Sequence, residues 1–191
     1  GMASDEQRKD CWDKAIHAFG TAYIFEQRSN KSRKKLRRLS ILGIAVPVVV
    51  GGIVVAFFGI DQMKPFLSGL IILAALLSTV QLVFTVWSFI AKWEDHAIYG
   101  SEASVENYQI ARLYEDLAKN NPADFDSKCD LLNVRNEMRS VEDGKKEITE
   151  PEKRMGMRAA LRKYQRACVK CTQVPVDMNP TDCPVCGNFY I

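Results

Sequence analysis

Two long apolar runs stand in the middle of an otherwise polar chain. Residues 41–60 and residues 66–91 contain no charged side chain, and only Asp61–Pro65 separates them. A helix of about 20 apolar residues can cross the ~30 Å hydrocarbon core of a bilayer. The pattern therefore predicts a transmembrane hairpin of two helices, at about 41–60 and 66–91.

The segment before the first run has the periodicity of an amphipathic helix. Over residues 4–30, Trp12, Ile16, Phe19 and Tyr23 follow one another at intervals of three or four residues and so share one helical face. This stripe is expected to pack against other helices of the same chain. The alternative is a helix that lies on the membrane surface with this face in lipid.

The segment after the hairpin predicts three further helices. They cover about 104–120, 122–142 and 150–167, with breaks at Asn121-Pro122 and Asp143-Gly144. Thr149 and Glu152 have the spacing of a capping box for the last helix. The expected inward faces carry Ile110, Leu113, Tyr114 and Leu117; Leu131, Val134, Met138 and Val141; and Met157, Leu161, Tyr164 and Cys168. With the first helix they predict a four-helix cytosolic bundle.

Charge next to the first run predicts how the hairpin is oriented. The net charge is only +3, but six basic residues precede the run directly: Lys31, Arg33, Lys34, Lys35, Arg37 and Arg38. Basic residues beside a span stay on the cytoplasmic side and attract anionic headgroups. Both termini are therefore expected in the cytoplasm, with a multi-pass hairpin in the membrane and its loop outside. Binding of nucleic acid is the less favoured use of this block.

The second run carries a seam of small and polar side chains. Its members recur at heptad-like spacing: Ala74, Ser78, Gln81, Thr85 and Ser88. Small residues let membrane helices approach closely, and polar ones can hydrogen-bond across the contact. Gln81, expected near the middle of the membrane, is unlikely to face lipid alone. The seam predicts either packing against the first span or a second copy, or the lining of a water path in an oligomer.

Four cysteines near the C-terminus predict a metal site. Two CxxC pairs are separated by eleven residues, and the ligands are Cys168, Cys171, Cys183 and Cys186. Four thiolates match the tetrahedral coordination of structural Zn²⁺ and leave no open position for catalysis. A redox pair or an iron–sulfur site are the alternatives. Gly187 is expected to take a left-handed conformation after the second pair, and Cys11 and Cys129 are expected in the core.

These features predict an all-α protein in four parts. They are a cytosolic helix with its basic segment (1–38), the hairpin (39–92), cytosolic helices (93–167) and a zinc knuckle (168–191). The sequence shows no phosphate-binding glycine loop and no paired catalytic carboxylates, and the apolar runs hold no Asp, Glu or His. A non-enzymatic role is therefore expected.

This architecture resembles the SLATT family of bacterial two-transmembrane proteins. The spacing of Cys168, Cys171, Cys183 and Cys186 is similar to that of the mobilome branch named for its CxxCx(11)CxxC signature. The resemblance implies a membrane effector in phage defence or nucleotide-signalling conflict, which oligomerises and permeabilises the membrane when a partner senses infection. The alternative is a membrane-anchored zinc adaptor that recruits a protein or nucleic acid through Lys170 and the basic helix Arg158–Arg166.

Overall fold

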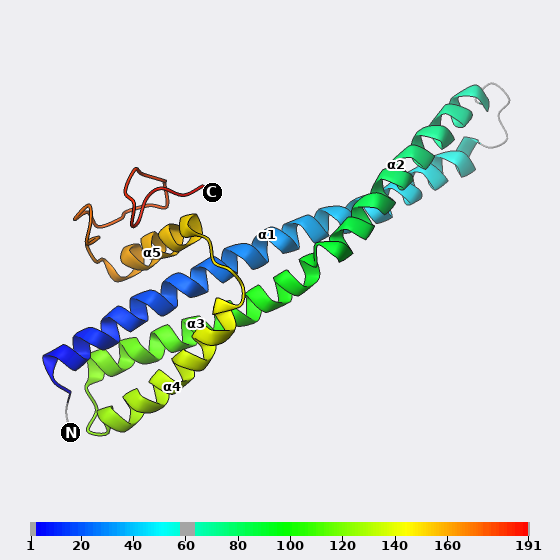
Figure 1. Cartoon of the computed structure of the whole chain (residues 1–191). Coiled ribbons are helices and arrows are strands. Elements are labelled where there is room, and N and C mark those ends of the chain that lie inside the picture. The colour runs from blue at the N-terminus through cyan, green and yellow to red at the C-terminus, as the bar shows by residue number, and fades with distance from the viewer. Residues whose placement is uncertain (1–2, 58–63, 191) are drawn as a thin grey trace. The chain divides into compact units, whose positions relative to one another are not determined.

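The computed structural model describes residues 3–57 and 64–190, and its regular structure in these ranges is entirely α-helical (Figure 1). The helices are α1 (Asp5–Phe57), α2 (Lys64–Ile90), α3 (Trp93–Asn120), α4 (Phe125–Gly144) and α5 (Glu150–Tyr164). The all-α prediction is confirmed. The predicted loop lies, apart from Lys64 and Pro65, outside the described residues, as does the end of the first run at 58–60.

The chain forms two compact units that share two helices. The helical unit contains Gly1–Arg28 and Tyr99–Ile191, and the hairpin unit contains Ser29–Ile98. Both boundaries fall inside a helix, the first within α1 and the second within α3. The separate N-terminal helix expected at 4–30 is instead the first part of α1, which continues through the basic block into the first run. Lys, Arg and Leu favour helix, and 21–42 contain neither Gly nor Pro, so nothing in the block ends it.

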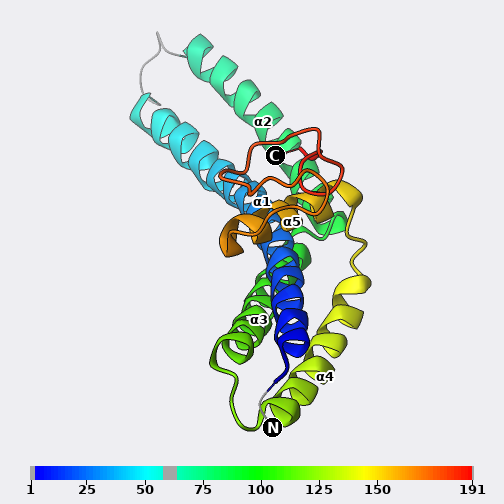
Figure 2. The same cartoon turned by 90° about the vertical axis from the view of Figure 1, so that its left-hand side faces the viewer.

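The core of the helical unit lies between α1, α3 and α4, which run side by side (Figure 2). Buried side chains from α1 (Cys11, Ala15, Ala18) meet Ile110, Tyr114 and Leu117 of α3 and Phe125 and Leu132 of α4. Trp12 and Phe19 pack against this cluster. The prediction that the N-terminal stripe packs against other helices of the chain is therefore confirmed.

The expected inward face of α4 is wrong. Leu131, Val134, Met138 and Val141 are 74%, 56%, 68% and 60% exposed, and α4 instead buries Phe125, Leu132 and Asp143. The inner face is partly polar, so the apolar stripe did not indicate it. Helix boundaries also differ: α3 begins at Trp93, and α4 begins at Phe125 with Pro122 before it, not in its first turn.

A buried carboxylate ties the end of α4 to α3. Asp143 is only 3% exposed. Its Oδ1 accepts hydrogen bonds from Tyr99 Oη at 2.8 Å and Arg139 Nε at 3.0 Å, and its Oδ2 accepts one from Asn107 Nδ2 at 2.7 Å. Burial and then the bond to Asp143 raise the pKa of the Tyr99 hydroxyl. The network holds α4 in the rotation that exposes its apolar stripe.

α5 crosses α1 at a contact between two glycines. Thr149 and Glu152 form the predicted capping box at its start, and Arg28 Nε lies 2.6 Å from Glu152 Oε1. A Cβ on Gly156 would lie 2.6 Å from the carbonyl oxygen of Gly20 and 2.9 Å from Ile24. Neither backbone can move aside without separating the helices, so only glycine fits at position 156.

Replacement of Gly156 by leucine is therefore expected to loosen α5 from α1. Overpacking of a tight contact costs about 1–3 kcal/mol, and here the obstacle is backbone. Gly144 has open space around its Cβ position and supplies the matched control. Thermal unfolding of the full chain in detergent should show a clear loss for Gly156→Leu and little change for Gly144→Leu. Equal midpoints would contradict the close crossing.

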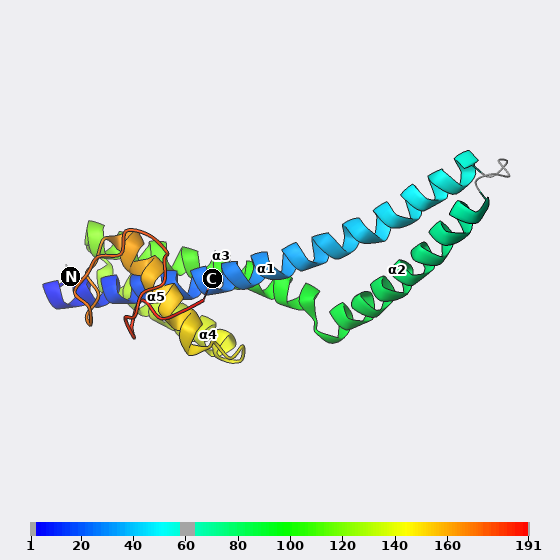
Figure 3. The same ribbon diagram turned by 90° about the horizontal axis from the view of Figure 1, so that it is seen from above.

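In the hairpin unit α2 runs antiparallel to the second half of α1 (Figure 3). Two contacts between α1 and the start of α3 fix the register of the returning segment: Ser29 Oγ donates to the Ala97 carbonyl at 2.7 Å, and Lys35 Nζ lies 5.0 Å from the Trp93 ring centroid. Further along, Gln81 abuts Gly43. The last residues of the second run thus lie level with the basic block. Gln81 is thus level with the third residue of the first run, although it is the sixteenth of the 26 residues in the second run. Its depth in the membrane stays a prediction.

Both helices of the hairpin are long and apolar enough to span a membrane. The best windows have mean hydropathies of 2.6 in α1 and 2.3 in α2, and none of their residues is buried within the chain. Side chains such as Val55 and Phe89 are 80% and 72% exposed. Exposed apolar surface of this extent needs an apolar surrounding.

Candidate metal centre

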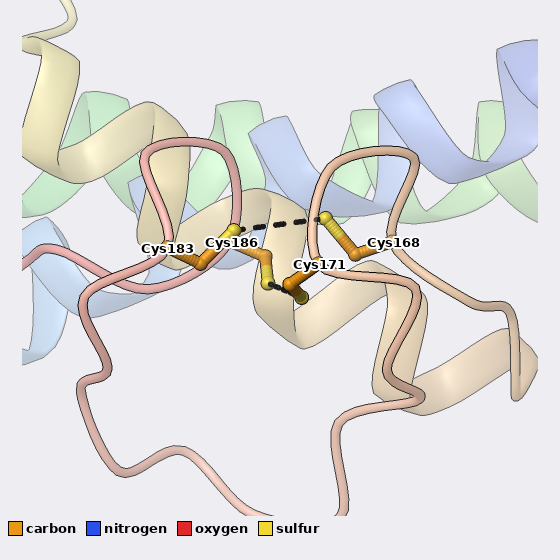
Figure 4. Close-up of side chains that lie close together, drawn as sticks. All are labelled: Cys168, Cys171, Cys183 and Cys186. Carbon is orange, nitrogen blue, oxygen red and sulfur yellow. Dashed lines mark hydrogen bonds between the residues drawn. The ribbon is translucent and has the colours of Figure 1, made fainter.

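The four predicted cysteines converge on one point (Figure 4). Their Sγ atoms all lie within 4.8 Å of one another, and three of the four residues are buried. Cys168 Sγ lies 3.9 Å from Cys183 Sγ, and Cys171 Sγ lies 3.7 Å from Cys186 Sγ. With Zn–S bonds of about 2.3 Å, sulfurs at the corners of a tetrahedron are about 3.8 Å apart. The arrangement can therefore hold one tetrahedral metal ion.

Each cysteine pair lies in a tight backbone turn. In the first turn, Thr172 N donates to the Cys168 carbonyl at 2.9 Å, and in the second, Gly187 N donates to the Cys183 carbonyl at 2.9 Å. The two turns differ in conformation. Thr172 has a φ of 58°, whereas Gly187 has no positive φ. The left-handed conformation expected at Gly187 is wrong, and its counterpart Thr172 adopts it instead.

Gly187 is required for a different reason. A Cβ there would lie 2.5 Å from the carbonyl oxygen of Thr181 and 2.8 Å from the amide nitrogen of Cys183. The segment that leads into the second turn packs against Gly187, and Thr181 N donates to the Gly187 carbonyl at 3.3 Å. A side chain at position 187 would push this segment away from the sulfurs.

The amides of the second turn favour a thiolate. Burial acts to raise the pKa of the Cys183 thiol, but hydrogen bonds from the backbone N–H groups of Cys186 and Val185 outweigh it and lower the pKa to about 6. Burial, followed by hydrogen bonds with the neighbouring thiols, raises the pKa of Cys186. A divalent cation bound there would displace the protons of the remaining thiols.

Arg158 of α5 holds the segment that carries the cysteines against the helix at two points. This segment, residues 165–190, is called the metal module below. Arg158 is 7% exposed. Its Nε and Nη2 donate to the Asp177 carbonyl and carboxylate at 2.9 and 3.1 Å, and its Nη1 donates to the Cys186 carbonyl at 3.4 Å. Met157 and Leu161 pack against the cysteine cluster on the same helix. The adaptor alternative places Arg158 on a basic partner-binding face, but this side chain is buried and engaged inside the unit and is not free for a partner.

The seam residues of α2 face in more than one direction. Ala74, Gln81 and Thr85 are half-buried and Ser88 is 8% exposed, whereas Ser78 is exposed. Thr85 Oγ1 donates to the Gln81 carbonyl at 2.9 Å, and Ser88 Oγ donates to the Thr85 carbonyl at 2.8 Å. Most of the seam is thus at least half-buried, and the hydroxyls of Thr85 and Ser88 are satisfied within α2.

Two close contacts were only weakly indicated by the sequence. The Gln81 side chain packs against Gly43, but Gly43 is one of several glycines in the first run. Gly20 and Gly156 meet in space although they lie far apart in the chain. Only a glycine inside an otherwise regular helical pattern indicated each close approach.

The basic block is solvent-facing, and its six residues are all exposed: Lys31, Arg33, Lys34, Lys35, Arg37 and Arg38.

The chain matches the family described as "Mobilome CxxCx(11)CxxC protein" over residues 8–189. The chain belongs to this family. The resemblance noted from the cysteine spacing is thereby confirmed, and the four cysteines that converge in space are those of the family's signature. Kinship of this mobilome family with SLATT proteins stays a prediction. Neither curated proteins nor solved structures contain a match to the chain.

Proposed function

We propose that this mobilome-family protein is a non-enzymatic effector of the bacterial inner membrane. A helical unit stabilised by structural Zn²⁺ controls a two-helix hairpin, and several copies associate to breach the bilayer. The basic block beside the first run supports cytoplasmic termini. Membership of a mobilome-associated family, with the resemblance to SLATT proteins, supports a role in phage defence or nucleotide-signalling conflict, with a sensor protein as the activating partner.

One observation carries the proposal: the two units are joined by two helices and no loop. The boundaries at Arg28/Ser29 and Ile98/Tyr99 both fall inside continuous helix. A passive anchor needs only a flexible tether, whereas a helix transmits rotation and translation. Because α1 also holds α5 and the metal module, a change at the cysteine cluster can reach the hairpin through α1.

Helix-breaking insertions test this coupling. Gly-Gly-Ser-Gly inserted after Arg28 and after Ile98 should abolish depolarisation and growth arrest in a bacterial host that expresses the chain, measured with a voltage-sensitive dye. An Ala-Ala-Ala-Ala insertion at the same places keeps helix and advances it by about one turn, so it should retain most of the effect. If wild type reaches the membrane yet leaves the potential unchanged, the effector role is wrong.

The seam has its own test. Changing Ser78, Gln81 and Thr85 together to leucine removes its central polar groups without shortening the apolar run. If the pore forms along the seam, depolarisation should fall sharply at unchanged membrane levels. Undiminished depolarisation would exclude the seam as the pore lining.

A membrane-anchored adaptor is the second candidate, and exposed apolar side chains on the metal module favour it. Val169 is 92% exposed, Val176 80% and Tyr190 88%. These residues would contact a partner protein. An adaptor predicts that both kinds of insertion, and exchange of the hairpin for an unrelated one, leave function intact.

A further inference from the structure

A groove opens between α1 and α2 where the hairpin meets the basic block. It has a volume of about 300 Å³ and is lined from both helices and from Trp93. All of its lining residues belong to the hairpin unit. Its walls change character along their length, from cationic through amide to purely apolar.

Two cations stand at one end of the groove. Lys35 and Arg38 line it, and they lie one turn apart on α1. Lys35 Nζ sits over the Trp93 ring, with 5.0 Å between Nζ and the ring centroid. The other basic residues of the block do not line the groove. An ammonium and a guanidinium at this spacing can share one phosphate, because the guanidinium fork matches two of its oxygens.

The polar end gives way to an amide and then to hydrocarbon. Gln81 lines the groove beside Gly43, which is five residues beyond Arg38 and so about 7.5 Å further along α1. The remaining walls are apolar: Leu39, Leu42 and Phe84 lie on the cationic side of Gln81, and Val46, Leu77 and Val80 lie at its level or beyond. Phosphate, ester carbonyl and acyl chain follow one another in this order in a phospholipid entering a bilayer.

We propose that this groove is a binding site for one anionic phospholipid. Its phosphate lies between Lys35 and Arg38, an ester carbonyl accepts from the Gln81 amide, and an acyl segment lies against the apolar walls. The proposal rests on the membrane location in the proposed function, but it does not require a pore. It also differs from diffuse attraction of the basic block, which would involve all six cations alike.

The experiment compares two pairs of substitutions that remove the same charge. Lys35→Gln with Arg38→Gln empties the end of the groove, whereas Lys34→Gln with Arg37→Gln removes neighbours at the same spacing outside it. The full chain is purified in mild detergent, titrated with phosphatidylglycerol, and analysed by native mass spectrometry. Wild type and the control pair should retain one lipid, and the groove pair should bind it about thirtyfold more weakly.

A groove-filling variant tests the acyl part. Leu77→Trp leaves both cations in place and should also lose the lipid, with helix content unchanged by circular dichroism. Equal weakening by the two charge pairs, no retained lipid in wild type, or full binding by Leu77→Trp would each overturn the proposal. Because the readout is bound lipid, its failure is distinct from a failure to depolarise cells.

Discussion

Substitution of Cys183 by serine is expected to abolish metal binding and unfold the C-terminal module. The wild-type chain should bind one Zn²⁺, and the variant essentially none, because a hydroxyl is a poor substitute for one of four thiolates. Structural zinc contributes an apparent ~10–16 kcal/mol at neutral pH. The module beyond α5 has no helix or strand within its described residues, 165–190. Nothing in its small apolar cluster can replace that contribution.

Metal content and proteolysis measure this outcome. Metal analysis of the full chain, purified without added zinc, should give about one ion per chain for wild type. Limited proteolysis should cut Cys183→Ser after Tyr164 while sparing α1, α3 and α4. Cys129→Ser is the matched control, since Cys129 packs against the other core and lies outside the cluster. Iron with visible absorption, or an inert protein without metal that resists protease, would contradict the zinc assignment.

Replacement of Asp143 by alanine is expected to destabilise the helical unit by about 1.5–3 kcal/mol. The Asp143 and Arg139 side chains are only 5% and 11% exposed, and loss of Asp143 leaves Arg139 with Glu106, 38% exposed and 3.1 Å away, as its remaining counter-charge. Asn107 and Tyr99 would lose their acceptor at the same time. A penalty of this size is a large share of the ~5–15 kcal/mol that stabilises a typical domain.

The neighbouring carboxylate gives the control. Glu142 pairs with Lys145 at 2.6 Å, but both side chains are more than half exposed. Glu142→Ala should change stability by less than about 0.5 kcal/mol. Urea unfolding of the full chain in detergent, followed by tyrosine and tryptophan circular dichroism, reports both variants. A small loss for Asp143→Ala would show that water reaches the network.

Features that depend on local chemistry could be predicted from the sequence. The metal cluster follows from the cysteine spacing, because two short turns suffice to bring each pair together. The start of α5 follows from Thr149 and Glu152, whose capping bonds involve only their own turn. The apolar runs followed from composition alone. In each case the deciding interactions lie within one short stretch of chain, and the paired sulfurs of the cysteine cluster come from residues fifteen apart.

Features that depend on contacts between distant parts of the chain could not be predicted from the sequence. The face of α4 was misassigned because Asp143 binds Tyr99 and Asn107 of another helix, which outweighs the apolar stripe. The role of Arg158 required knowing where Asp177 and Cys186 fold back onto α5. The position of Gln81 opposite Gly43 depends on the register between α1 and α2, which neither apolar run specifies by itself.

The division of the helical unit also dictates an order of assembly. Its first segment ends at Arg28, and its second begins only at Tyr99, after the whole hairpin. At about 5–20 residues per second, synthesis of the 70 residues 29–98 takes roughly 4–14 s, and Cys11 and Phe25 wait at least that long for the second segment. During that time their apolar face is open to chaperones and to nascent neighbours. In the membrane location that we propose, the hairpin is complete before the second half of the core is synthesised, and a chain that fails to reach the membrane is expected to be removed before it folds.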